Sequence, residues 1–249
     1  MRKGADVTEE QEGAKARIGV IVPSVNTIVE PFFNKAVPSG VTIHASRMLL
    51  SSELSFEAIA EMDEIAGMQA VRQVASCRCD AIAYCCTASS VVHGLAYDTE
   101  LCASIAREGA APATTVAGGI LAALGLMAIH TIVIASPYPP ALDRAERDFF
   151  AAAGYTVIAS RGMGISNSFD LAKPQPADIY RFAESVWSDE ADALVLTCAN
   201  FRSHEVVEPL EISLGKPVIT STQASLWRVL RLAGIMSTIP GLGILFRSH

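Results

Sequence analysis

The chain has 249 residues, of which 51% are hydrophobic and 18% are charged, and its formal net charge is −7 at pH 7. This length and apolar content predict one large domain or two small lobes with a sizeable buried core. The acidic balance argues against nucleic acid as a partner, because a negative surface repels phosphates. An anionic ligand must therefore be held by local dipoles and hydrogen-bond donors.

The N-terminal segment and the cysteines indicate the cellular compartment. Residues 1–16 lack the apolar stretch of an export signal, so we expect a disordered tail and a cytoplasmic protein. The six cysteines are then free thiols in a reducing environment. No apolar run approaches the roughly 20 residues that span a bilayer, so we expect no membrane partner.

From Arg17 onward, short apolar runs alternate with segments of helix length. The predicted strands are Ile18–Val22, Val41–Ala45, Ala81–Tyr84, Ile132–Ala135, Thr156–Ala159, Ala193–Leu196 and Val218–Ile219. The predicted helices are Phe56–Ser76, Ser104–Glu108, Val116–Leu126, Leu142–Ala153, Ala177–Ser188 and Ala224–Leu232. This alternation predicts an α/β fold with mainly parallel sheets whose faces are covered by helices.

An internal repeat divides the chain into two similar halves. The segments that resemble each other, in the same order, are 18–24 with 132–138, 80–86 with 192–198, and 112–115 with 217–220. We therefore predict two similar lobes. Their expected bounds are 17–115 plus 220–249 for the first lobe and 116–219 for the second. Ligands of open α/β sheets lie beyond the carboxyl ends of the strands, so we expect the active site in the cleft between the lobes.

Two cysteines occupy matching places in this repeat. Cys86 and Cys198 each follow an apolar strand and precede a polar segment, so we predict that they face each other across the cleft. A cysteine that begins a helix is close to oriented N–H groups and the helix dipole, which lower its pKa and favour the thiolate. The alternative is a buried, unreactive apolar side chain. Cys85, beside Cys86, is expected to point into the core.

Other polar side chains are candidates for binding the ligand. Ser24 and Asn26 end the first strand, where their side chains and nearby N–H groups form either an anion-binding nest or a simple helix cap. Thr87 adds a hydroxyl directly after Cys86. Tyr138 holds the matching place in the second lobe and is either a hydrogen-bond donor in the cleft or an interface tyrosine. Asn167 lies in a loop that reaches the cleft, unless it is only a turn residue.

Cofactor, metal and hydrolase chemistry find little support in the sequence. No G-x-G-x-x-G or phosphate-binding loop pattern occurs, so we expect no nucleotide cofactor. Cys77 and Cys79 have no second cysteine pair and no close histidine, so we expect no metal site. A cysteine–histidine hydrolase would need His93 or His204 within hydrogen-bond reach of a candidate thiol, which the intervening helix disfavours for His93.

Five segments resemble a known family. PSVNTIVE, YCCTASS, ASPY, LTCANFR and GKPVITSTQASLWRVLRLAGI are similar to the maleate cis–trans isomerase and arylmalonate decarboxylase branch of the aspartate/glutamate racemase superfamily. The resemblance covers nearly all of residues 17–236. It implies two Rossmann-like lobes in pseudo-twofold relation, with cofactor-independent chemistry between them. It also implies a small dicarboxylate or related carboxylic acid as partner, and a homo-oligomer.

The resemblance assigns a role to each matching residue. Cys86 matches the nucleophilic cysteine of the isomerases, and Cys198 matches its partner. Three further residues match the groups that hold the substrate carboxylates: Asn26, Tyr138 and Asn167.

Two departures from the family pattern bear on the substrate. Val25 stands where the isomerases commonly have a serine. Ala199, which we also place in the substrate site, stands where they commonly have a threonine. These changes leave the identity of the acid open.

The presence of both cysteines selects among the reactions of the family. The decarboxylases that this chain resembles keep only the second cysteine and have glycine at the first position. We therefore predict isomerisation of maleate to fumarate, in which the Cys86 thiolate adds to the alkene, the new single bond rotates and the thiolate leaves. The alternatives are a two-thiol racemase or decarboxylase of a small carboxylic acid, and a dicarboxylate-binding protein without catalysis.

Overall fold

The computed structural model describes residues 15–249. The predicted tail at 1–16 lies outside the described residues, except for its last two positions. Ala16 already belongs to the first strand and is buried, so the ordered part of the chain includes this end of the predicted tail.

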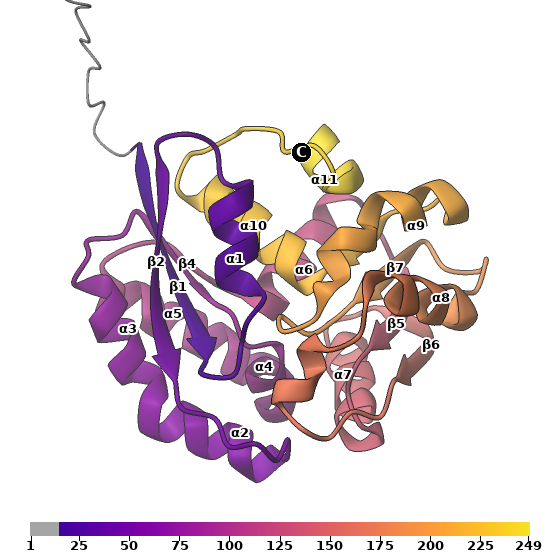
Figure 1. The fold of residues 1–249 in the computed structure, drawn as a ribbon, viewed down its shortest axis with the longest axis horizontal. Helices are drawn as coiled ribbons and strands as arrows, with labels where there is room; N and C mark the ends of the chain where they lie inside the picture. Colours follow the sequence, from indigo (N-terminus) through magenta and orange to yellow (C-terminus); the bar gives the residue numbers. More distant parts are fainter. Residues whose placement is uncertain (1–14) are drawn as a thin grey trace, which may run out of the picture.

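Two four-stranded parallel sheets form the scaffold (Figure 1). The first sheet has the strand order β2-β1-β3-β4 and the second has β6-β5-β7-β8, so the two sheets share one topology. The strands of the first sheet are β1 (Ala16–Pro23), β2 (Val41–Met48), β3 (Ala81–Tyr84) and β4 (Ala113–Thr115). Those of the second sheet are β5 (Thr131–Ser136), β6 (Thr156–Gly162), β7 (Ala193–Leu196) and β8 (Val218–Thr220). The predicted α/β fold of two similar lobes is confirmed.

The helices cover both sheets. They are α1 (Val29–Ala36), α2 (Phe56–Met62), α3 (Met68–Ala75), α4 (Thr87–His93), α5 (Leu95–Gly109), α6 (Val116–Leu126), α7 (Pro140–Ala152), α8 (Pro176–Val186), α9 (Val207–Leu214), α10 (Ser221–Leu232) and α11 (Gly243–Ser248). The single helix predicted at 56–76 is divided by one turn of π-helix at Asp63–Gly67, which joins α2 to α3. Such a turn inserts an extra residue and changes the direction in which the side chains around it point.

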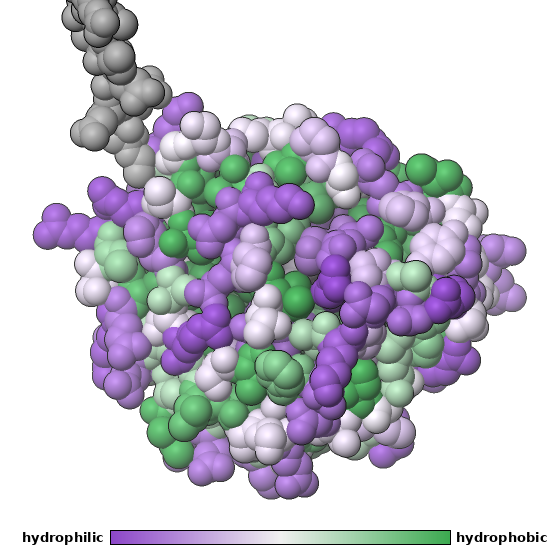
Figure 2. All heavy atoms as spheres, in the orientation of Figure 1, coloured by the Kyte–Doolittle hydropathy of each residue, from purple (hydrophilic) through white to green (hydrophobic). Residues whose placement is uncertain are grey.

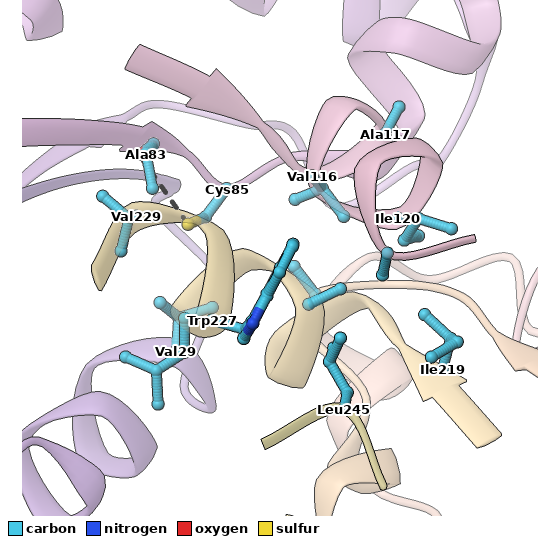
Figure 3. Close-up of a cluster of buried hydrophobic side chains, with 14 of the residues drawn as sticks. Val29, Ala83, Cys85, Val116, Ala117, Ile120, Ile219, Trp227, Val229 and Leu245 are labelled. Carbon is cyan, nitrogen blue, oxygen red and sulfur yellow. Dashed lines mark hydrogen bonds between the residues drawn. The ribbon is translucent and has the colours of Figure 1, made fainter. Parts of the chain in front are cut away.

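Helices α6 and α10 pack against each other where the two sheets meet (Figure 1). Gly119 of α6 makes this approach possible, because a Cβ there would lie 3.1 Å from the carbonyl oxygen of Ala224 in α10. Figure 3 shows Ile120 of α6, Trp227 of α10 and Ile219 of β8 in the resulting apolar core. Burial of side chains of this size stabilises a fold by about 1.5–3 kcal/mol each, so this core holds the two lobes together.

Cys85 belongs to the same core, as predicted. Its side chain is fully buried, and its Sγ donates to the carbonyl oxygen of Ala83 at 3.7 Å (Figure 3). Burial raises the pKa of this thiol, so it stays protonated. Cys85 therefore packs the end of β3 and leaves the chemistry to its neighbour.

The surface around α2 carries exposed apolar side chains. Leu49 and Ile65 are 82% and 68% exposed. Figure 2 shows hydrophobic residues gathered toward the lower left, where α2 lies, on a face that elsewhere mixes hydrophilic and hydrophobic residues. Within residues 15–249, no helix combines the length and the apolar character that a membrane crossing requires.

Candidate active site

A cavity of about 30 Å³ lies where the carboxyl ends of the strands from both lobes meet. The residues that line it come from the segments after β1, β2, β3, β5, β6 and β7, at the edge that the rule for parallel sheets predicts. Both candidate cysteines line this cavity. The other candidate residues that line it are Asn26, Thr87, Tyr138 and Ala199.

Cys86 forms the junction between β3 and α4. It is the residue before the first turn of α4 and is only 6% exposed. Burial raises its pKa to about 12, and the negative charge of Asp63 acts in the same direction. The Ser89 hydroxyl and the backbone N–H groups of Ser89 and Ala88 oppose this rise, as expected at a helix start. The predicted lowering of the Cys86 pKa is therefore wrong, because removal of the thiolate from water outweighs the donors.

Cys198 follows β7 and is 2% exposed. Its φ of 82° lies in the left-handed region, which is strained for a residue with a side chain. Burial raises its pKa to about 12, whereas the Tyr138 hydroxyl and the backbone N–H of Asn200 oppose this rise. Cys86 also raises the pKa of Cys198, because the two sulfur atoms share one small space. The two thiols thus face the same cavity from opposite lobes.

Asn26 connects the two lobes. Its Nδ2 donates to the carbonyl oxygen of Ala199 at 3.1 Å, and its Oδ1 accepts from the N–H groups of Ile28 and Val29 at 3.0 and 2.9 Å. The side chain is 2% exposed. Asn26 therefore positions the start of α1 and touches the turn that carries Cys198.

Asn200 makes the reciprocal connection, and the sequence analysis missed it. Its Oδ1 accepts from the N–H of Thr27 at 3.0 Å, and its Nδ2 donates to the carbonyl oxygens of Val25 and Ser168 at 3.4 Å. A signal was present in the strand endings, because Asn26 and Asn200 each stand two residues after a polar residue that follows an apolar strand, Ser24 and Cys198.

Ser24 and Asn167 lie outside the cavity lining. Ser24 Oγ accepts from the N–H of Leu50 at 3.1 Å and so anchors the segment after β2. Asn167 is exposed, and its Oδ1 accepts from the N–H of Phe169 at 3.0 Å. Its neighbour Ser168 is fully buried and lines the cavity instead.

Asp63 is a buried carboxylate next to Cys86 that the sequence analysis did not single out. It lies on the π-helical turn, and its Oδ1 accepts from the Tyr84 hydroxyl at 2.5 Å and from the Ser89 hydroxyl at 2.8 Å. Its Oδ2 lies 3.5 Å from His93 Nε2 and has no hydrogen-bond partner within residues 15–249. Burial raises the pKa of Asp63, while its Tyr84, Ser89 and His93 neighbours act to lower it.

Glu146 is a second buried carboxyl near the site, on α7. It is fully buried, and burial raises its pKa to about 8. The hydroxyls of Thr197 and Ser136 oppose this rise, although the part of the chain that the structure describes offers neither carboxyl oxygen a partner in hydrogen-bond geometry. A negative charge on Glu146 would raise the pKa of both Cys198 and Tyr138. Ionisation of Glu146 would therefore make Cys198 hold its proton more tightly.

The remaining wall of the cavity is apolar. It consists of Val25, Leu50, Leu54, Ile59 and Leu171. No arginine or lysine is among the lining residues, so a bound anion must be held by N–H groups, hydroxyls and amides. Within residues 15–249, no three His, Cys, Asp or Glu side chains cluster as a metal site would require.

Comparison with known proteins finds relatives over most of the chain. A family model described as arylmalonate decarboxylase matches residues 18–246. A maleate isomerase of Pseudomonas putida is 28% identical, over 92% of this chain and 96% of the relative. A maleate isomerase of Geobacillus stearothermophilus is 26% identical, over 92% and 96%. Among solved structures, a mutant maleate cis–trans isomerase of Nocardia farcinica superposes with a TM-score of 0.88 at 24% identity, over 94% of this chain and 99% of that chain. That structure contains a covalently bound succinylcysteine intermediate.

Proposed function

The chain belongs to the arylmalonate decarboxylase family, and from that premise we propose that it is a cofactor-independent isomerase that converts maleate, or a closely related cis-dicarboxylate, into the trans isomer. The observation that carries this proposal is the pair of buried thiols, one from each lobe, on a single cavity. Two further facts support it: maleate isomerases are among the relatives, and the Nocardia farcinica enzyme holds a succinylcysteine.

Cys86 is the nucleophile in this proposal. Its thiolate adds to one alkene carbon and forms a C–S bond, while the alkene electron pair moves into the adjacent carboxylate to give an aci-carboxylate. The former double bond is now single and rotates. The electron pair then returns, the alkene re-forms with the trans geometry and the C–S bond breaks. No atom is gained or lost, so the thiolate is regenerated in each cycle.

The start of α4 stabilises the charge that develops during addition. The N–H groups of Ala88 and Ser89 face the Cys86 sulfur, and the Thr87 hydroxyl lies at the same wall of the cavity. Each well-placed donor of this kind lowers a barrier by about 3 kcal/mol. Asn26 and Tyr138 supply amide and hydroxyl donors to the substrate carboxylates, and the protonated Cys198 thiol faces the intermediate from the second lobe.

Decarboxylation of a substituted malonate is the second candidate function. The apolar wall of Leu50, Leu54, Ile59 and Leu171 favours it, because a malonate with an apolar substituent would pack there. In that reaction Cys198 would protonate the carbanion that remains after loss of carbon dioxide. Cys86 favours the isomerase, since its side chain occupies the place where the decarboxylases have only a glycine.

An ultraviolet assay of the loss of the cis isomer tests the proposal. Purified protein is mixed separately with maleate, methylmaleate and a panel of aryl- and alkylmalonates, and the products are identified by proton NMR. We expect maleate or its methyl derivative to be converted to the trans isomer. Carbon dioxide release from a malonate, with no turnover of either alkene, would replace the isomerase with the decarboxylase.

A further inference from the structure

The proton on Cys86 needs a destination before the sulfur can attack. The thiol is buried, with only 6% of the residue exposed, and its pKa of about 12 keeps it protonated at neutral pH. Cys198 is a poor acceptor, because burial raises its pKa to about 12 as well and this thiol therefore already carries its own proton at neutral pH. A third group must therefore take the proton when the C–S bond forms.

A line of polar side chains leads from Cys86 to the surface. The Ser89 hydroxyl faces the Cys86 sulfur and donates to Asp63 Oδ1 at 2.8 Å. Asp63 Oδ2 faces His93 Nε2 at 3.5 Å. The side chain of Asp63 is 4% exposed and that of His93 is 27% exposed. The line thus begins at a buried sulfur and ends at a group that reaches water.

We propose that Asp63 accepts the Cys86 proton through Ser89, with His93 linking this carboxyl to the solvent. The Cys86 S–H gives its proton to Ser89 Oγ while the Ser89 O–H gives its own proton to Asp63 Oδ1. The thiolate then forms the C–S bond, and Asp63 is a neutral carboxylic acid. When the C–S bond breaks, the regenerated thiolate recovers its proton along the same path before the next addition. This inference rests on the proposed addition of Cys86 to an alkene.

The surroundings of Asp63 suit a proton acceptor better than a structural anchor. Its Oδ1 carries two hydroxyl donors, whereas its Oδ2 has no hydrogen bond within the described residues. Burial raises the pKa of Asp63, so the carboxylate is a stronger base than an exposed one. The titratable groups around it are Tyr84 on β3, Cys86 and His93 on α4, and Tyr97 on α5. The π-helical turn explains its position, because such turns place side chains where a regular helix would not.

Helix α4 supplies a matched control for this line. Ser90, the next residue, is also fully buried, and its hydroxyl donates to the buried carboxylate of Asp98. Neither Ser90 nor Asp98 lines the cavity. Substitutions of this second serine–aspartate pair therefore remove the same chemical groups at similar burial without touching the proposed proton path.

The test compares Asp63→Asn and Ser89→Ala with Asp98→Asn and Ser90→Ala, using maleate turnover across the pH range. We expect kcat to fall about 100-fold in the first two variants, with little change in KM, because proton transfer by a positioned group contributes at least that much. The fall in wild-type activity at low pH, caused by protonation of Asp63, should disappear in Asp63→Asn. The Asp98→Asn and Ser90→Ala variants should keep wild-type kcat and its pH profile.

Alkylation of Cys86 by iodoacetamide separates proton transfer from damage to the site. Removal of the Asp63 charge lowers the Cys86 pKa, so alkylation of the Cys86 peptide should be faster in Asp63→Asn, although turnover is slower. A variant in which both rates fall, or in which turnover matches Asp98→Asn, overturns the relay. If wild-type protein turns over none of the alkenes, the proposed function itself fails, which is a different result.

Discussion

The turns that carry Cys86 and Cys198 occupy equivalent places in two sheets of the same topology, but they surround their sulfur atoms with different partners. Cys86 stands before a helix and faces a serine, an aspartate and a partly exposed histidine. Cys198 has a left-handed backbone and faces Tyr138 and the fully buried Glu146. One turn thus has a path to water and the other is sealed. The repeat sets where the two sulfur atoms lie, whereas the residues that surround each sulfur decide which thiol loses its proton.

Exchange of the two cysteines for alanine, one at a time, tests this difference most directly. Cys86→Ala should abolish turnover and prevent formation of a covalent adduct, because no other lining thiol has a route for its proton. Cys198→Ala should lower turnover by roughly 100- to 1,000-fold, the usual contribution of one donor that stabilises developing negative charge, yet still form an adduct at Cys86. Intact-protein mass spectrometry after incubation with maleate measures the adduct. Its appearance on the Cys86→Ala protein would reverse the roles of the two lobes.

Glu146→Gln tests the buried surroundings of Cys198 through the pH dependence of the free energy of unfolding. The carboxyl ionises at its ordinary pKa of 4.5 in the unfolded chain and at about 8 in the folded protein. The unfolded state therefore loses its proton first, so the stabilisation is complete below about pH 4.5 and is lost as the pH rises toward 8. Wild-type protein should lose roughly 3–5 kcal/mol more than the variant over this interval. Urea unfolding at pH 5 and pH 8 measures the difference, and parallel pH dependence in both proteins would contradict the assignment.

Asn26→Ala and Asn200→Ala compare the two connections between the lobes. Asn26→Ala should destabilise the fold by about 2 kcal/mol, because it leaves the N–H groups of Ile28 and Val29 and the Ala199 carbonyl without their partner. Asn200→Ala should cost about 1 kcal/mol, since its two donated hydrogen bonds are longer, at 3.4 Å. Urea midpoints report both effects. Equal losses of stability in the two variants would contradict the predicted difference and mean that the two connections contribute alike.

Much of the fold could be predicted from the sequence because its signals are local. Apolar runs bounded by polar residues revealed seven strands, and the repeat revealed the shared topology. Strand β4 was missed although β8 has the same length of three residues, because β4 contains a single apolar residue, Ala113, whereas β8 begins with Val218 and Ile219. Helix α1 contains Pro31, and Ile28 directly before it provides no side-chain cap; the capping oxygen comes from Asn26, three residues before the helix begins, so the helix is weakly marked in the sequence.

The chemistry of the site was less predictable because it depends on contacts between distant segments. The two cysteines and Tyr138 could be assigned from strand endings, which always gather at one edge of a parallel sheet. Asp63 approaches Cys86 only because a π-helical turn redirects its side chain, and no residue pattern in the sequence predicted that turn. The pKa of Cys86 was predicted in the wrong direction, since a sequence shows the start of a helix but not how deeply the sulfur lies.

The hydrogen bond from Asn26 to the Ala199 carbonyl has a consequence for ligand entry. A cavity of about 30 Å³ has room for only about one or two water molecules, so a dicarboxylate must push its walls apart. Asn26 Nδ2 is then the natural group to exchange a peptide oxygen for a carboxylate oxygen. The same amide would hold the two lobes together before the ligand binds and would bind the ligand afterwards. Binding of the dicarboxylate would thereby loosen the turn that carries Cys198 and widen the cavity.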